Sequence, residues 1–187
     1  MKLSSMISFA AVALAVALPS VATASTSNPP DLYLGRQGAV SCNLCHSHAG
    51  TGSGSVSIQG LPKMYEPGKS YPLTVKVVEP GAKKAGFRLA AQTSDGAQAG
   101  KIVNRDPSLD VHVATDNVTY LKQSYNGSDT NGSERSWTFL WKAPEGGSVK
   151  FSVDAVAGDG DGTVTGDHSY SFSASAQAGQ SSRGQAD

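Results

Sequence analysis

Apolar side chains recur at every second position along most of this chain, and this period of two limits the possible folds more than any other feature. In the segment 71–77, Tyr, Leu, Val and Val alternate with Pro, Thr and Lys. Successive side chains of a β-strand point to opposite faces, so this alternation predicts a strand with one buried face. The pattern recurs at 87–91, 137–141, 149–155 and 170–174, with weaker matches at 56–58, 101–103 and 111–113.

Turn-forming sequences separate these runs: Glu66-Pro67-Gly68, Glu79-Pro80-Gly81, Asn126-Gly127 and Asn131-Gly132. Beyond the N-terminal leader, no longer window has the 3.6-residue period of a helix. Roughly seven or eight short strands of this kind predict an all-β fold, a sandwich of two sheets, with an up-and-down barrel as the structural alternative. We expect Trp137 and Trp141 in the core of the sandwich rather than on a sugar-binding surface.

The N-terminus has the features of a signal peptide. Lys2 gives it a positive start, the apolar run Met6–Leu18 follows, and Ala22-Thr23-Ala24 matches a cleavage site. We therefore divide the chain into a signal peptide (1–24), an N-terminal segment (25–54), a β-sandwich domain (55–175) and a polar tail expected to be disordered (176–187).

Export and charge narrow the range of partners. The signal peptide predicts a periplasmic or extracellular protein, and no second apolar run predicts a membrane span in the mature chain. The full chain has 15 basic and 15 acidic residues, and removal of the leader takes away Lys2. A charge this close to zero gives no reason to expect nucleic acid as a partner.

The segment Cys42-Asn43-Leu44-Cys45-His46 is the strongest chemical motif in the chain. Its two cysteines are the only ones in the sequence. Thiols at this spacing can add to the two vinyl groups of one haem, and the imidazole that follows can then bind the iron. We therefore predict one covalent haem c, held by Cys42 and Cys45, with His46 as the proximal iron ligand.

Other interpretations of these cysteines stay open. After export, Cys42 and Cys45 could form a local disulfide, with His46 on the surface. They could also form half of a zinc site, although no second Cys/His pair of matching spacing exists. A thioredoxin-like motif would need an α/β fold, which the β pattern contradicts.

A six-coordinate haem iron would need a second axial ligand. The candidates are Met64, His112 and His168, or the position is open. His48 is too close to His46 to reach the other side of the same porphyrin. Alternation turns His112 toward solvent, whereas His168 precedes the last predicted strand, where its side chain could meet the N-terminal segment.

Two further groups of residues carry little chemistry. The acidic stretch 154–167 contains Asp159-Gly160-Asp161-Gly162, but it lacks the ligand spacing and the Glu of an EF-hand loop, and its composition favours a turn. The Ser, His and acidic residues form no recognisable catalytic set, so we do not expect an enzyme.

The order of several blocks resembles a known family. They are Cys42–Ser47, Tyr65–Tyr71, Gly86–Leu89, Trp137–Pro144 and Gly166-Asp167. Together they resemble bacterial secreted choice-of-anchor V domains, which are similar to the Reeler domain, over roughly residues 36–175. The resemblance implies an immunoglobulin-like sandwich with a Cys-x-x-Cys-His segment ahead of its first strand. It also implies a His before the Trp block, where this chain has Tyr120–Gln123, and a C-terminal anchor, where this chain has a polar tail.

Two functions follow as expectations. The first is an exported monohaem c-type protein that transfers electrons or senses redox state together with a redox partner protein. The alternative is a non-enzymatic, immunoglobulin-like binding or adhesion module in which Cys42 and Cys45 form a structural disulfide.

Overall fold

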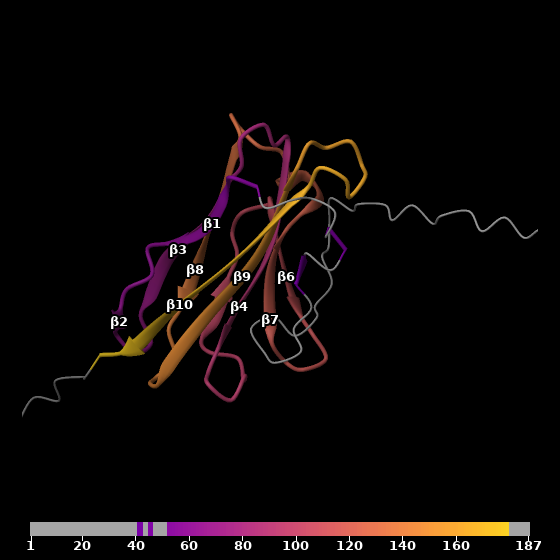
Figure 1. Ribbon diagram of the computed structural model, residues 1–187. Coiled ribbons are helices and arrows are strands. Elements are labelled where there is room, and N and C mark those ends of the chain that lie inside the picture. Colours follow the sequence, from indigo (N-terminus) through magenta and orange to yellow (C-terminus); the bar gives the residue numbers. More distant parts are fainter. Residues whose placement is uncertain (1–40, 43–44, 47–51, 180–187) are drawn as a thin grey trace, which may run out of the picture.

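The structure is a computed structural model, and it describes residues 41–42, 45–46 and 52–179. The signal peptide, most of the N-terminal segment with His48, and residues 180–187 of the tail lie outside the described residues. In the part that is described, ten strands form two sheets that face each other (Figure 1). The predicted all-β, two-sheet sandwich is confirmed.

The sheets divide the strands unequally. The four-stranded sheet has the order β1-β3-β8-β5, and the six-stranded sheet has the order β2-β10-β9-β4-β7-β6. The strands are β1 (Ser55–Gln59), β2 (Met64–Tyr65), β3 (Ser70–Val78), β4 (Lys84–Gln92), β5 (Lys101–Val103), β6 (Leu109–Val113), β7 (Thr119–Gln123), β8 (Glu134–Lys142), β9 (Ser148–Gly158) and β10 (His168–Ala178). A short 3-10 turn, Tyr125–Gly127, joins β7 to β8. Among the described residues, no helix is long and apolar enough to cross a membrane.

Most of the apolar runs predicted from the sequence form the interior, but the run at 111–113 does not, because Val111 and Val113 on the edge strand β6 are 41% and 60% exposed. The five main runs lie in β3, β4, β8, β9 and β10, and the three weaker ones lie in β1, β5 and β6. Antiparallel pairing sets Val75 opposite Trp137 and Leu89 opposite Val153, so the apolar faces of neighbouring strands are continuous. The two sheets bury these faces against each other.

Trp137 and Trp141 lie at the centre of this core, as predicted, and both are fully buried. The ring of Trp141 packs edge-on against Tyr65 and Phe151, with centroids 5.3 and 5.0 Å away. Its indole N–H donates to the carbonyl of Ala99 at 3.1 Å. Large aromatic rings whose polar atom is also bonded contribute strongly to stability, so these residues are structural.

The predictions for the last strand need correction. Tyr170, Phe172 and Ala174 face the core side, but Phe172 is 38% exposed and the other two are only half-buried. The six-stranded sheet is wider than the sheet that covers it, so its flanking strands are partly uncovered. The strand also continues to Ala178 with Ala176 buried, so the first three residues of the predicted tail belong to the sandwich.

The outer face of the six-stranded sheet differs from the expected solvated surface. Lys122, Arg88, Asp154 and Ser171 lie side by side across β7, β4, β9 and β10, and we call this set the polar row. Alternation predicts exposed side chains here, yet Lys122 and Arg88 are each 2% exposed and Asp154 is 6% exposed. A charged row this deeply buried distinguishes this face from an ordinary sandwich surface.

Candidate functional site

The described residues of the motif, Cys42, Cys45 and His46, lie beside the six-stranded sheet. The backbone N–H of His46 donates to the carbonyl of Cys42 at 3.1 Å, which closes one helical turn. Cys42 is half-buried, Cys45 is exposed, and both are free thiols. The turn therefore presents two thiols and one imidazole within five residues.

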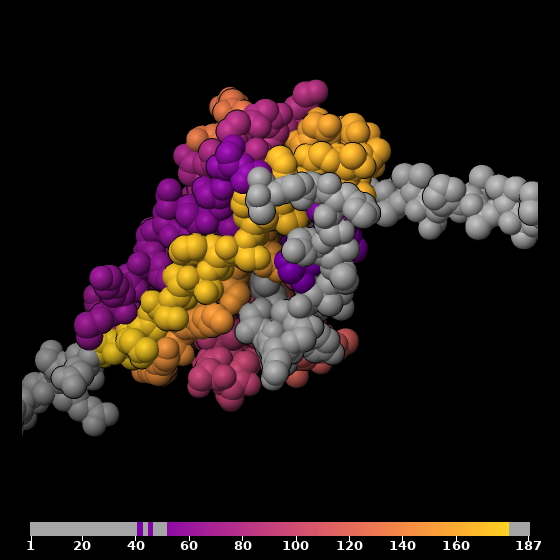
Figure 2. Space-filling view, in the orientation of Figure 1, coloured from indigo at the N-terminus to yellow at the C-terminus, as the bar shows by residue number. Residues whose placement is uncertain are grey.

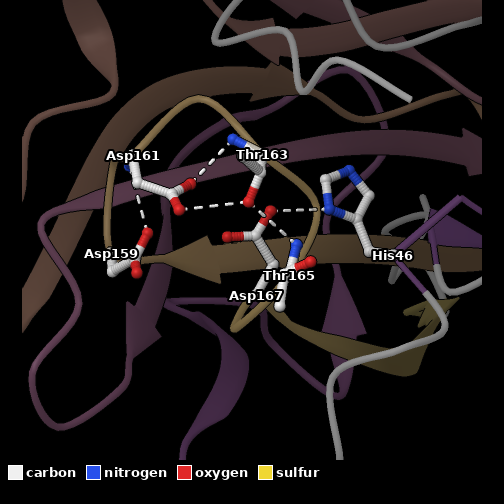
Figure 3. A network of polar contacts seen from close by, with 6 residues as sticks. All are labelled: His46, Asp159, Asp161, Thr163, Thr165 and Asp167. Atoms are coloured by element: carbon white, nitrogen blue, oxygen red, sulfur yellow. Dashed lines mark hydrogen bonds and ion pairs between the residues drawn. The ribbon is translucent and has the colours of Figure 1, made fainter. Parts of the chain in front are cut away.

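The imidazole of His46 is held by a carboxylate from the far end of the chain. Its Nδ1 lies 2.7 Å from Oδ2 of Asp167, the residue just before β10 (Figure 3). The two side chains are 18% and 8% exposed. Because the carboxylate accepts, Nδ1 carries the hydrogen of this bond, and Nε2 is left as the other ring position.

Asp167 belongs to a loop whose own hydrogen bonds fix its shape. Between β9 and β10, the N–H of Asp161 donates to Asp159 at 3.0 Å, and the N–H of Thr163 donates to Asp161 at 2.7 Å. Thr165 then donates to the hydroxyl of Thr163 at 3.2 Å. The loop stands out from one end of the molecule, and described atoms of the Cys42–His46 turn lie beneath it (Figure 2). The hydrogen bonds within the loop are those of turns, as its composition predicts. Among the described residues, no group of three or more His, Cys, Asp or Glu side chains could hold a metal ion.

Cys42 lies next to the polar row. Arg88 donates from Nη2 to Asp154 at 3.0 Å, and Ser171 donates to the other oxygen of Asp154 at 2.7 Å. Burial and, to a smaller extent, the Asp154 carboxylate raise the pKa of the Cys42 thiol to about 11. The folded chain therefore keeps this sulfur protonated and unreactive at neutral pH.

A second group of contacts fixes the point where the N-terminal segment joins β1. The N–H of Gly54 donates to Glu79 at 3.0 Å and lies 3.2 Å from the hydroxyl of Tyr170, which also donates to Glu79. His168 lies 3.4 Å from the other oxygen of Glu79. Burial, followed by the bond to Glu79, raises the pKa of Tyr170 to about 12.

The candidate second axial ligands are dispersed. Met64 lies in β2 and is 64% exposed. His112 is exposed on the edge strand β6, as alternation predicts. His168 is paired with Glu79, and His48 lies outside the described residues. The side chain of His46 is bonded instead to Asp167.

Sequence reasoning located the thiols and the imidazole but missed their surroundings. It expected His168 to meet the N-terminal segment, and the His168 side chain does lie against Gly52. What it missed is the contact of the preceding residue, Asp167, with His46. It also missed the buried pair of Arg88 and Asp154. The signal in the sequence was a positive charge, Arg88, in the middle of one strongly apolar strand and a negative charge, Asp154, in another.

Fold and site together define the class of the protein: an all-β sandwich with a Cys-x-x-Cys-His turn beside the six-stranded sheet. No family model matches the chain, and no curated protein matches it. Solved structures with a similar fold include the reeler domain of human F-spondin, at 19% identity over 72% of this chain and 98% of that one, with a TM-score of 0.43.

Other similar structures belong to different kinds of protein. The major pilin SpaD from Corynebacterium diphtheriae matches at 16% identity over 65% of this chain and 35% of its own, with a TM-score of 0.42. A structure described as AvmM, which catalyses macrocyclization in alchivemycin A biosynthesis, matches at 12% identity over 73% and 94%, with a TM-score of 0.40. The likeness is one of overall architecture, so the function has to be argued from the site.

Proposed function

We propose that this chain is an exported protein that carries one covalent c-type haem. Cys42 and Cys45 form the two thioether links, and His46 is the proximal iron ligand. In each link the sulfur bonds to one carbon of a vinyl group and the thiol hydrogen goes to the other carbon, so no atom is lost and no oxidant is needed.

The observation that supports this proposal is the contact between His46 Nδ1 and Asp167. A metal-ligating His almost always donates its second ring N–H to a carboxylate, a carbonyl or water, because this bond fixes the tautomer and the direction of the ring. In this chain the bond is in place at the one His that follows the Cys pair. Its partner is a largely buried carboxylate that lies 121 positions away in the sequence.

The described residues fit the proposed group by their donor chemistry. Two thiols and an imidazole are the protein groups that a c-type haem uses, and here the imidazole is also bonded to a carboxylate. Bound haem would supply one-electron redox chemistry. Cys42 is half-buried beside the polar row, so we expect attachment to precede the packing of this turn, while the thiol is still accessible to the attachment machinery.

Within this proposal, the protein transfers electrons or senses redox state outside the cytoplasm. The sandwich provides a rigid support, because His46 is bonded to the β9–β10 loop and that loop joins the two longest strands. The exposed side chain of Cys45 indicates that this part of the site faces solvent, where a redox partner protein can approach.

A second candidate function is an immunoglobulin-like binding or adhesion module. The partial burial of Cys42 favours it, because a half-buried cysteine three positions from an exposed one is also suited to a structural disulfide. The kinds of protein that share this fold, a reeler domain and a pilin among them, agree with such a role. On this account His46 and Asp167 only anchor the turn.

The visible absorption spectrum distinguishes the two functions. The full chain is expressed in cells that export it and have a c-type haem attachment system, and the purified protein is reduced with dithionite. We expect sharp Soret and α bands that remain after acid–acetone extraction, and their loss in the Cys42→Ala/Cys45→Ala variant. A colourless wild-type protein with an oxidised Cys42–Cys45 pair would support the binding module instead.

A further inference from the structure

We infer that Asp167 is a positioning residue that sets the electronic state of the iron site through His46. The inference rests on the proposed function and extends it from attachment to regulation of the redox potential. Its claim is that the carboxylate of Asp167 lowers the reduction potential of the haem. It acts through the imidazole and does not touch the haem iron.

The bond between the two side chains is short and shielded. The distance of 2.7 Å is in the range of a charge-assisted hydrogen bond, and Asp167 is only 8% exposed. Water screens such a pair weakly, so the carboxylate acts on the ring more strongly than an exposed acid would. A strong acceptor at Nδ1 increases the basicity of Nε2, the nitrogen that would bind the iron.

The position of the Asp167 carboxylate also depends on the lack of a side chain at Gly158. A Cβ added to Gly158, at the end of β9, would lie 1.8 Å from Oδ1 and 2.8 Å from Cγ of Asp167. The Asp167 side chain therefore occupies space that only a glycine leaves open. One oxygen packs against the backbone of β9, and the other faces His46.

This arrangement favours the oxidised iron. A more basic imidazole donates more electron density, and a nearby negative charge stabilises the extra positive charge of the ferric state. Both effects have the same sign, so both lower the potential. A second pair of an acid and a histidine in the same chain provides a contrast. Glu79 lies 3.4 Å from His168, but His168 does not follow a cysteine in the sequence, and Glu79 also accepts a hydrogen bond from Gly54.

The test compares four variants of the haem-loaded full chain. Asp167→Asn keeps the shape of the side chain and removes its charge, and Asp167→Glu restores the charge. Gly158→Ala leaves the acid intact but displaces it. Asp161→Asn is the matched control, because Asp161 lies in the same loop and its hydrogen bonds go to Thr163 within that loop.

The measurements are the midpoint potential, by spectroelectrochemical titration, and the iron–His stretching frequency of the ferrous protein by resonance Raman. We expect Asp167→Asn and Gly158→Ala to shift the potential to more positive values and the frequency downward. Asp167→Glu should return both toward wild type, and Asp161→Asn should change neither. A loss of stability alone would not produce this pattern.

Two other outcomes separate the inference from the proposed function. If the wild-type chain takes up no haem, the proposed function is wrong. If haem attaches and both Asp167→Asn and Gly158→Ala keep the wild-type potential and frequency, the proposed function stands and the inference about Asp167 is overturned. Where Asp167→Asn fails to fold, Gly158→Ala and Asp167→Glu decide the matter by the same two measurements.

Discussion

At the scale of single residues, the pair of Arg88 and Asp154 is the most unusual feature of the scaffold. Opposite each other on β4 and β9, their side chains are 2% and 9% exposed. A buried pair of this kind is costly to bring out of water, and removal of one partner leaves the other charge uncompensated. The pair therefore makes the outer face of this sheet sensitive to mutation, although it lies outside the apolar core.

We predict that Asp154→Ala lowers the free energy of unfolding by about 3–5 kcal/mol, measured by urea denaturation. Asp129→Ala serves as the control, because Asp129 pairs with Lys84 on the exposed surface. Exposed ion pairs contribute little, so the control should unfold close to the wild-type midpoint. Equal midpoints for both variants would mean that the buried pair does not stabilise the fold.

The raised pKa of Tyr170 predicts that the stability of the fold decreases at alkaline pH. Its pKa in the folded protein is about 12, above the ordinary value of 10.0. Between these two values the unfolded chain releases the phenolic proton and the folded chain keeps it. Stability from this group is therefore complete below about pH 10 and is lost as the pH rises toward 12.

The measurement is the free energy of unfolding in urea at about pH 9 and about pH 11. The wild type should lose more stability over this interval than Tyr170→Phe, which has no phenolic proton to release. Parallel profiles for the two proteins would show that Tyr170 titrates at the same pH in the folded and unfolded chains.

At the scale of elements, the strands are the part of the structure that the sequence predicts best. The run Leu73–Val77 and the run Trp137–Trp141 each have one uniformly apolar face, and both occur as central strands of the smaller sheet. Alternation fails where tertiary position overrides it. Phe172 faces the core side, yet it is 38% exposed, and Arg88 faces outward, yet it is buried.

The connection into β5 offers a sharp test of local geometry. Gly100 has a φ of +73°, and a Cβ there would lie 2.4 Å from the carbonyl of Lys142 and 2.6 Å from Nε1 of Trp141. A left-handed backbone costs a non-glycine residue about 1–2 kcal/mol, and the contacts add to that cost. Gly100→Ala should therefore lower the thermal midpoint clearly.

Gly146 provides the matched control for this substitution. It lies on an exposed turn, has no positive φ, and an added Cβ would meet nothing within 4 Å. Gly146→Ala should leave the midpoint unchanged or raise it, because it restricts the unfolded chain by about 0.4–1 kcal/mol. A larger loss at Gly146 than at Gly100 would contradict the described turn geometry.

At the scale of the whole molecule, the candidate site is only partly visible in the sequence. The two thiols and His46 are found at once, because they are adjacent and form a known motif. Asp167 is 121 positions away from His46, and only the folded sandwich brings its loop to the N-terminal turn. The role of Gly158, which leaves room for the Asp167 side chain, is visible only in the folded structure, because a glycine at the end of a strand can be there for many reasons.

We also predict that the β-sandwich folds without the two cysteines of the Cys-x-x-Cys-His motif. The core is built from the two sheets, and none of the three described residues of the motif, Cys42, Cys45 and His46, belongs to it. The Cys42→Ala/Cys45→Ala variant should therefore keep a β-type far-UV circular dichroism spectrum and a cooperative urea transition while losing all visible colour. An unfolded spectrum would show that the turn, or what it carries, is needed to assemble the sandwich.

The central claim is that this β-sandwich carries one haem bonded to Cys42 and Cys45, and the intact mass of the denatured mature protein tests it most directly. Denaturation removes any haem that is not covalently bound. We predict a mass that exceeds that of the polypeptide by about 616 Da, the mass of one haem. A mass that is instead two hydrogens below that of the reduced polypeptide, with both sulfurs in one disulfide, would contradict the claim.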